Sequence, residues 1–99
     1  MGEIGHFIGG RAVEGRSGRF GDVYQPMDCS VIARVALATK AEVREAVENA
    51  LQAQPAWAAT NPQRRARVMM AFLALLNREM DALADLLARE HGKTIPDAK

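Results

Sequence analysis

The glycines near the start of the chain are the residues whose spacing most suggests a ligand site. Seven of the eight glycines lie in residues 1–21, interleaved with arginines. Glycine backbone approaches phosphate oxygens closely, and arginine adds positive charge. The stretch nevertheless lacks the G-x-G-x-x-G and G-x-x-x-x-G-K-[ST] patterns, and Gly92-Lys93-Thr94, which ends like the second, has no glycine at position 87. We therefore favour a solvated hairpin loop over a phosphate site.

The remaining reactive side chains are few and scattered. Cys29 is the only thiol, and it follows Asp28 in a predicted turn, with no base or helix N-terminus to activate it. The histidines stand at opposite ends of the sequence, which predicts solvent exposure for His6 and a helix C-terminus for His91. Nothing clusters in the way a metal requires. The residues alone therefore predict no catalytic, cofactor-binding or metal-binding side chain.

Charge and hydropathy exclude further classes. With 13 Lys and Arg against 12 Asp and Glu, the net charge of +1 gives no electrostatic basis for nucleic-acid binding. The basic patch Arg64, Arg65 and Arg67 has no interleaved aromatics, so it reads as a face that forms salt bridges with other protein groups. The longest apolar run, Val68 to Leu76, falls well short of the roughly 20 residues that span a membrane. No signal peptide is evident, and the expected location is the cytoplasm.

The elements that would position these residues change type along the chain. Sixteen of the eighteen alanines lie at position 36 or later, which predicts a Gly-rich β-hairpin segment over 1–38 and a helical segment over 39–99. Both would belong to one incomplete α+β domain. Phe7-Ile8 and Val13 flank a Gly9-Gly10 turn. Residues 15–21 read as a loop, and Val23-Tyr24 should pair with Val31–Val35 around a turn at 26–30.

Start and stop signals divide the helical segment. Thr39 and Glu42 fit a capping box, and Pro55 should end or kink the first helix near Ala53 or Gln54. Asn61-Pro62 then marks the start of a second helix.

Apolar residues of the second helix recur at alternating spacings of four and three, a heptad-like stripe that holds Met69, Leu73, Leu76, Met80, Leu83 and Leu87. The pattern is long for one globular helix, so we expect a break near Asn77–Asp81 and a stop at Gly92. The residues 94–99 look like the entry to another helix without room to form one, so we expect a truncated polypeptide.

Six short segments follow one another in a characteristic order: Phe7-Ile8-Gly9-Gly10, Val23-Tyr24-Gln25-Pro26, Val31-Ile32-Ala33-Arg34-Val35, Pro55-Ala56-Trp57, Pro62-Gln63-Arg64-Arg65-Ala66-Arg67 and Glu90-His91-Gly92-Lys93-Thr94. This order resembles the N-terminal part of an aldehyde dehydrogenase. The resemblance covers His6 to Lys99, and the chain is most similar to the CoA-acylating methylmalonate-semialdehyde dehydrogenase branch.

The turn after Pro26 departs from the family pattern. The family usually reads Pro-Ala-Thr-Gly there, whereas this chain has Cys29 in the glycine position. A side chain in the left-handed region costs on the order of 1 kcal/mol. The departure therefore predicts a looser hairpin or a different turn.

The resemblance implies a fold, a reaction and partners. The fold would be an N-terminal β-hairpin segment followed by two or three amphipathic helices that wrap the cofactor-binding domain as a scaffold. The parent enzyme would use NAD to oxidise a thiohemiacetal and transfer the acyl group to CoA, giving propionyl-CoA with loss of carbon dioxide. Its catalytic cysteine, dinucleotide-binding fold and oxyanion-stabilising asparagine would all lie beyond residue 99. The 99 residues alone would then bind no cofactor and be inactive.

Two kinds of partner remain open from the sequence. The first is the missing remainder of a homo-oligomeric dehydrogenase, with no nucleic acid and no membrane involved. The alternative is a self-standing helical module that dimerises through the Met69–Leu87 stripe.

Overall fold

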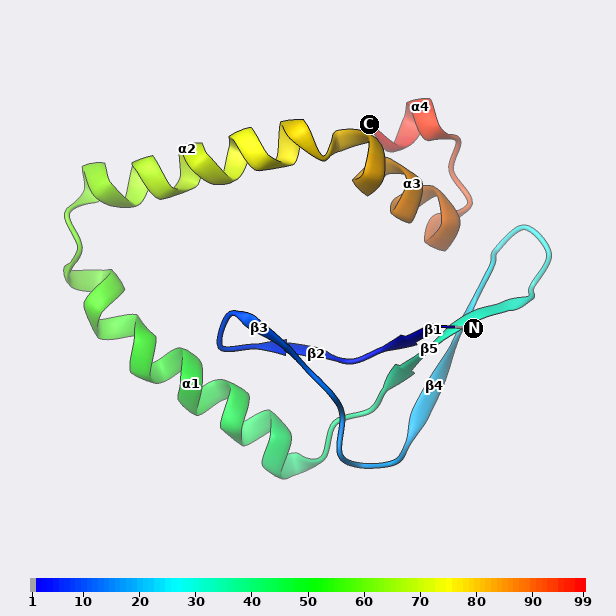
Figure 1. Cartoon of the computed structure of the whole chain (residues 1–99), viewed down its shortest axis with the longest axis horizontal. Coiled ribbons are helices and arrows are strands. Elements are labelled where there is room, and N and C mark those ends of the chain that lie inside the picture. The colour runs from blue at the N-terminus through cyan, green and yellow to red at the C-terminus, as the bar shows by residue number, and fades with distance from the viewer. Residues whose placement is uncertain (1) are drawn as a thin grey trace. The chain divides into compact units, whose positions relative to one another are not determined.

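The computed structural model describes residues 2–99 (Figure 1). The chain forms two compact units: Met1–Tyr24 with Ser30–Ala58, called unit 1, and Gln25–Cys29 with Ala59–Lys99, called unit 2. The elements in chain order are β1 (Gly2–Ile4), β2 (His6–Ile8), β3 (Arg11–Val13), β4 (Phe20–Tyr24), β5 (Val31–Ala36), α1 (Lys40–Ala59), α2 (Pro62–Arg78), α3 (Met80–His91) and α4 (Ile95–Ala98). Short strands followed by helices confirm the predicted α+β class. The division at residue 38 stays a prediction.

Unit 1 contains a three-stranded sheet with the strand order β1-β5-β4 and a two-stranded sheet formed by β2 and β3. The centre of the three-stranded sheet is β5, which pairs antiparallel with β4 and parallel with β1. Arg34 on β5 binds neighbours on both sides: its guanidinium pairs with Glu3 of β1 and lies 4.1 Å from the ring centroid of Phe20 on β4. The sequence reading missed β1, because three residues with no alternation give no local strand signal.

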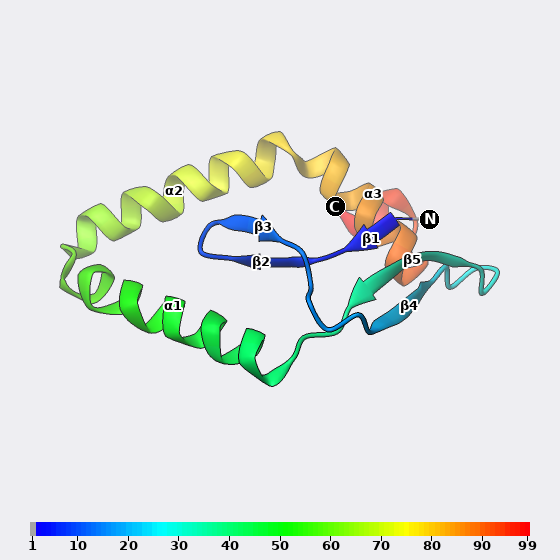
Figure 2. The same ribbon diagram turned by 60° about the horizontal axis from the view of Figure 1, so that its bottom comes forward.

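Both predicted hairpins form. The β2–β3 hairpin turns at Gly9 and Gly10, whose φ values of 65° and 78° suit residues without a side chain. The β4–β5 hairpin encloses the predicted turn, with Val23 opposite Ala33. The predicted loop over 15–21 was two residues too long, because Phe20 and Gly21 already pair with β5. In both ribbon views the β2–β3 hairpin projects away from the three-stranded sheet (Figure 2).

The turn at Cys29 corrects the expectation of a different turn geometry. Cys29 has φ 61° and is the single non-glycine residue with positive φ among residues 2–99. Its N–H donates to the carbonyl oxygen of Gln25 at 2.8 Å, which closes the turn. The left-handed backbone is therefore kept although a side chain occupies the position, at a steric cost of about 1–2 kcal/mol.

Helix α1 begins as predicted and ends later. The Thr39 hydroxyl accepts from the Glu42 N–H, and the Glu42 carboxylate accepts from the Thr39 N–H, both at 3.0 Å. The capping box is thus confirmed. Of the two predicted effects of Pro55, an end of the helix near Ala53 or Gln54 was wrong, because α1 continues through Pro55 to Ala59. The alternative, a kink there, stays a prediction. The alanines around Pro55 favour helix strongly enough to continue it past the missing N–H.

The helices of unit 2 follow the start and stop signals. Asn61 caps α2 through its side-chain oxygen, which accepts from the Gln63 N–H at 2.8 Å. The predicted break is confirmed between Arg78 and Met80, and Gly92 ends α3 in the left-handed conformation with φ 78°. Residues 94–99 were expected to lack room for a helix, which was wrong: Thr94 caps the single turn of α4.

Little of this structure is buried. Among residues 2–99 the buried side chains are those of Ala36, Glu42 and Ala84. Large apolar side chains remain exposed on every longer helix, including Val47, Leu51, Val68, Met69, Met70, Phe72, Leu73, Leu86 and Leu87. Faces of this composition usually bury against another protein surface. No helix within the described residues is long and apolar enough to cross a membrane.

Candidate functional site

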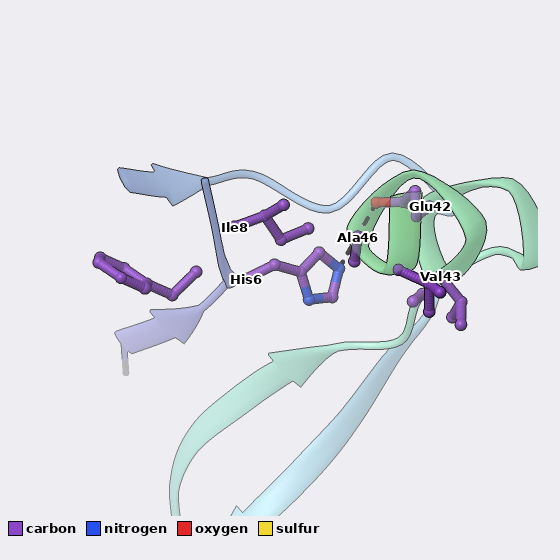
Figure 3. A pocket seen from close by; sticks show the side chains of 8 residues that line it. His6, Ile8, Glu42, Val43 and Ala46 are labelled. Carbon is purple, nitrogen blue, oxygen red and sulfur yellow. Dashed lines mark ion pairs between the residues drawn. The ribbon is translucent and has the colours of Figure 1, made fainter. Parts of the chain in front are cut away.

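The most organised polar cluster lies in unit 1, where the β2–β3 hairpin meets the first turn of α1. His6 Nε2 lies 3.5 Å from Glu42 Oε2, and the two side chains point toward each other at the edge of a groove (Figure 3). The imidazole is only 18% exposed, so the predicted solvent exposure of His6 was wrong. The prediction failed because this contact joins residues 36 positions apart, which no local pattern reveals.

Glu42 is the anchor of the cluster and is only 4% exposed. Its carboxylate accepts from the Thr39 N–H at 3.0 Å and from the Arg16 N–H at 3.2 Å. The hydrogen bond from the Thr39 backbone is the largest effect that lowers the pKa of Glu42, and burial opposes it. The balance keeps the carboxylate charged inside the cluster, where it can pair with a protonated His6.

The loop before β4 closes over the same place. Gly15 has no room for a side chain, since a Cβ there would lie 2.6 Å from Ala36 Cβ and 3.3 Å from His6 Nε2. The next residue adds a second link, because the Arg16 guanidinium pairs with Glu45 Oε2 of α1 at 2.6 Å. The cluster thus fastens the hairpin, the loop and α1 to one another.

The groove beside the cluster has a volume of about 320 Å³. Apart from His6 and Glu42 its walls are apolar, formed by Phe7, Ile8, Ala38, Val43, Ala46 and Val47. The lining contains a base and a carboxylate but no thiol or hydroxyl nucleophile. The groove can therefore bind an apolar group beside the polar side chains of His6 and Glu42. It contains no side chain that could attack a substrate as a covalent nucleophile.

The other residues singled out in the sequence lie elsewhere. Cys29 is exposed in its turn, and His91 is exposed in the last turn of α3, as predicted. Gly92-Lys93-Thr94 ends one helix and precedes only the four residues of α4, so it forms no phosphate loop. Among residues 2–99 no group of three or more His, Cys, Asp or Glu side chains is placed to hold a metal. That the chain lacks catalytic and cofactor-binding residues stays a prediction.

The predicted salt bridges of the basic patch do not form within the described residues, where Arg64, Arg65 and Arg67 have no ion pair. Elsewhere in unit 2 Asp81 binds Lys99 at 2.6 Å, and this hydrogen bond lowers the pKa of Asp81. Asp81 is almost fully exposed, so solvent screens the pair and it adds little stability.

Replacing Glu42 by glutamine is expected to remove one source of acid sensitivity. Because folding lowers the pKa of Glu42 from its ordinary 4.5, its stabilising contribution is complete above that pH and is lost as the pH falls through the folded-state pKa. Urea unfolding followed by ellipticity at several pH values should show a smaller acid-induced loss of stability for Glu42→Gln than for the wild type. The exposed Glu48→Gln on the same helix is the control, and an unchanged acid response in Glu42→Gln would contradict this role.

Comparisons with known proteins give the family. The aldehyde dehydrogenase family model matches residues 12–99. The structure is similar to that of a methylmalonate-semialdehyde dehydrogenase from Sinorhizobium meliloti complexed with NAD, with 57% identity, a TM-score of 0.93, and coverage of 97% of this chain and 20% of that one.

Two curated relatives belong to the same family. The mitochondrial acylating methylmalonate-semialdehyde/malonate-semialdehyde dehydrogenase of Homo sapiens is 39% identical over 94% of this chain and 17% of that protein. The malonate-semialdehyde dehydrogenase of Pseudomonas aeruginosa is 38% identical over 99% of this chain and 20% of that protein. The chain thus spans about a fifth of the length of these relatives, and it belongs to the aldehyde dehydrogenase family.

Proposed function

We propose that this chain is the N-terminal scaffold part of an NAD-dependent, CoA-acylating methylmalonate-semialdehyde dehydrogenase. The observation that carries the proposal is the 57% identity to the Sinorhizobium meliloti enzyme over nearly the whole chain, at a TM-score of 0.93. In this proposal the parent enzyme converts methylmalonate semialdehyde to propionyl-CoA, a step in valine breakdown, and transfers hydride to NAD. It does so in the cytoplasm as a homo-oligomer.

The architecture supports a scaffold role within that enzyme. The apolar faces of α1 and α2 are exposed, as expected of surfaces that pack on a larger body. The most organised polar cluster links elements of unit 1 and offers no nucleophile. In the proposal the thiol that attacks the aldehyde, the dinucleotide-binding fold and the CoA site all belong to the other four fifths of the enzyme.

The test is reconstitution. The 99-residue chain is mixed with the Sinorhizobium meliloti enzyme lacking its equivalent N-terminal part, and NADH formation is followed at 340 nm with methylmalonate semialdehyde, NAD and CoA. We expect activity from the mixture and none from either part alone. NADH formation by the 99-residue chain alone would contradict the assignment of chemistry to the remainder, and an inactive mixture would contradict the scaffold role.

The second candidate, a self-standing dimerisation module, rests on the exposure of Met69, Leu73, Leu83 and Leu87. The structure divides this stripe between α2 and α3 at Glu79, so no continuous helical seam runs along it. A compact dimer of the isolated chain in sedimentation, without activity in the mixture, would favour this second candidate.

A further inference from the structure

His6 is a titratable side chain held beside a buried carboxylate. Its Nε2 points toward Glu42 and lies 3.5 Å from Oε2 (Figure 3), which is within reach of an ion pair and long for a hydrogen bond. The same nitrogen is buried and has no hydrogen-bond partner among residues 2–99. A Cβ on Gly15 would lie 3.3 Å from it, so the loop shields it from water on that side. A buried polar atom without a partner costs free energy, and pairing with the carboxylate lowers that cost.

The protonation state of the imidazole decides whether this contact is attractive. Histidine exchanges its proton between about pH 5 and pH 8. Glu42 stays charged over that range, because its pKa is lowered from 4.5, chiefly by the hydrogen bond from the Thr39 backbone and also by the positive charge of His6. A neutral imidazole offers the carboxylate no charge, and one of its two tautomers turns a lone pair toward it. The imidazolium instead turns an N–H and a positive charge toward the carboxylate.

The other charged groups around His6 leave its surroundings negative. The loop before β4 contributes Glu14, which lines a second cavity together with His6. The same loop contributes Arg16, but its guanidinium pairs with Glu45 Oε2 of α1 at 2.6 Å. The strand β3 places an uncharged residue opposite His6. With the arginine already paired, the carboxylates of Glu14 and Glu42 remain, and negative charge attracts the protonated ring.

We propose that His6 and Glu42 form a pH-sensitive latch within unit 1. The protonated imidazole pairs with the carboxylate and fastens the β2–β3 hairpin to α1, and loss of that proton releases the fastening. The latch is closed in the pH window above the protonation of Glu42 and below the deprotonation of His6, and it opens as the pH rises beyond that window. All its parts lie in unit 1, so it is independent of the proposed dehydrogenase function.

The test follows amide hydrogen exchange of residues 6–13 in the 99-residue chain by nuclear magnetic resonance, from about pH 5.5 to about pH 8. His91→Gln is the background of every sample, which leaves His6 as the only histidine. After correction for the intrinsic exchange rate at each pH, protection of these amides is expected to fall by about 3-fold to 10-fold as the pH rises, the effect of losing one ion pair. His6→Gln keeps the capping box and should abolish this fall.

The ring signals of His6 give a second measurement. In Glu42→Gln, which removes the negative charge, the ring should titrate at a lower pH than in the background chain. Glu48→Gln, exposed on the same helix, is the control and should leave the titration in place.

Three results would each overturn the latch: constant protection in the background chain, an equal fall in His6→Gln, or a ring titration that Glu42→Gln does not move. Far-ultraviolet ellipticity checks that each variant keeps its helix content. If Glu42→Gln loses helix, the exchange measurement with His6→Gln still decides the outcome.

Discussion

Replacing Gly15 by alanine is expected to destabilise unit 1 by about 1–3 kcal/mol, the usual cost of forcing an extra carbon into a packed site. The added Cβ would lie 2.6 Å from Ala36 Cβ, well inside van der Waals contact, and 3.3 Å from His6 Nε2. Ala36 is buried in the central strand and cannot move without disturbing the sheet. Urea unfolding followed by ellipticity should show a lower midpoint.

The matched control is Gly21→Ala in β4. A Cβ at position 21 would meet Val35 Cγ1 at 3.6 Å, an ordinary contact, and the backbone there is not left-handed. We expect Gly21→Ala to be neutral or slightly stabilising, since alanine restricts the unfolded chain. If both variants unfold at the same urea concentration, that result would contradict the close packing of Gly15 against Ala36 of β5.

Replacing Pro55 by alanine is expected to stabilise α1 by up to about 3 kcal/mol, the difference between the two residues in a helix interior. Pro55 is the sixteenth of the twenty residues of α1 and has no N–H to donate to the carbonyl of Leu51. Alanine restores that hydrogen bond and removes the clash of the ring with the preceding turn. The expected readouts are stronger ellipticity at 222 nm and a higher urea midpoint.

The neighbouring change Gln54→Ala separates the effect of proline from that of added alanine. Glutamine and alanine differ little in helix propensity, so Gln54→Ala should move the midpoint by only a few tenths of a kcal/mol. A gain in Gln54→Ala as large as that in Pro55→Ala would show that the helix is generally marginal there. No gain in Pro55→Ala would mean that α1 already compensates for the missing bond.

Local rules predicted the helix ends well. The Thr39–Glu42 capping box, the Asn61 cap and the Gly92 stop each depend on residues within four positions of one another. Interactions at this range need no tertiary partner, so sequence determines them. Pro55 is the exception, because the alanine-rich surroundings outweigh a breaker that the same rules place at a helix end.

Long-range contacts escaped the same reasoning. The pairing of β1 with β5 joins Glu3 to Arg34, and the cluster at His6 joins three separate segments. Neither contact has a periodic signal in the sequence. The available local signals were Gly15, which lies in the predicted loop before a strand, and Glu42, which belongs to the capping box. Arg65 was predicted only as part of a basic patch, and the burial of its Nε is visible only in the structure.

The parallel pairing of β1 with β5 also orders the folding of the sheet in time. The hairpins β2–β3 and β4–β5 close loops of a few residues, whereas β1 must wait for a strand about thirty residues further along the chain. Closing the longer loop costs more chain entropy before any contact repays it. During synthesis β1 is therefore the last strand to join the three-stranded sheet. The β2–β3 hairpin forms before β5, the partner of β1, has been made.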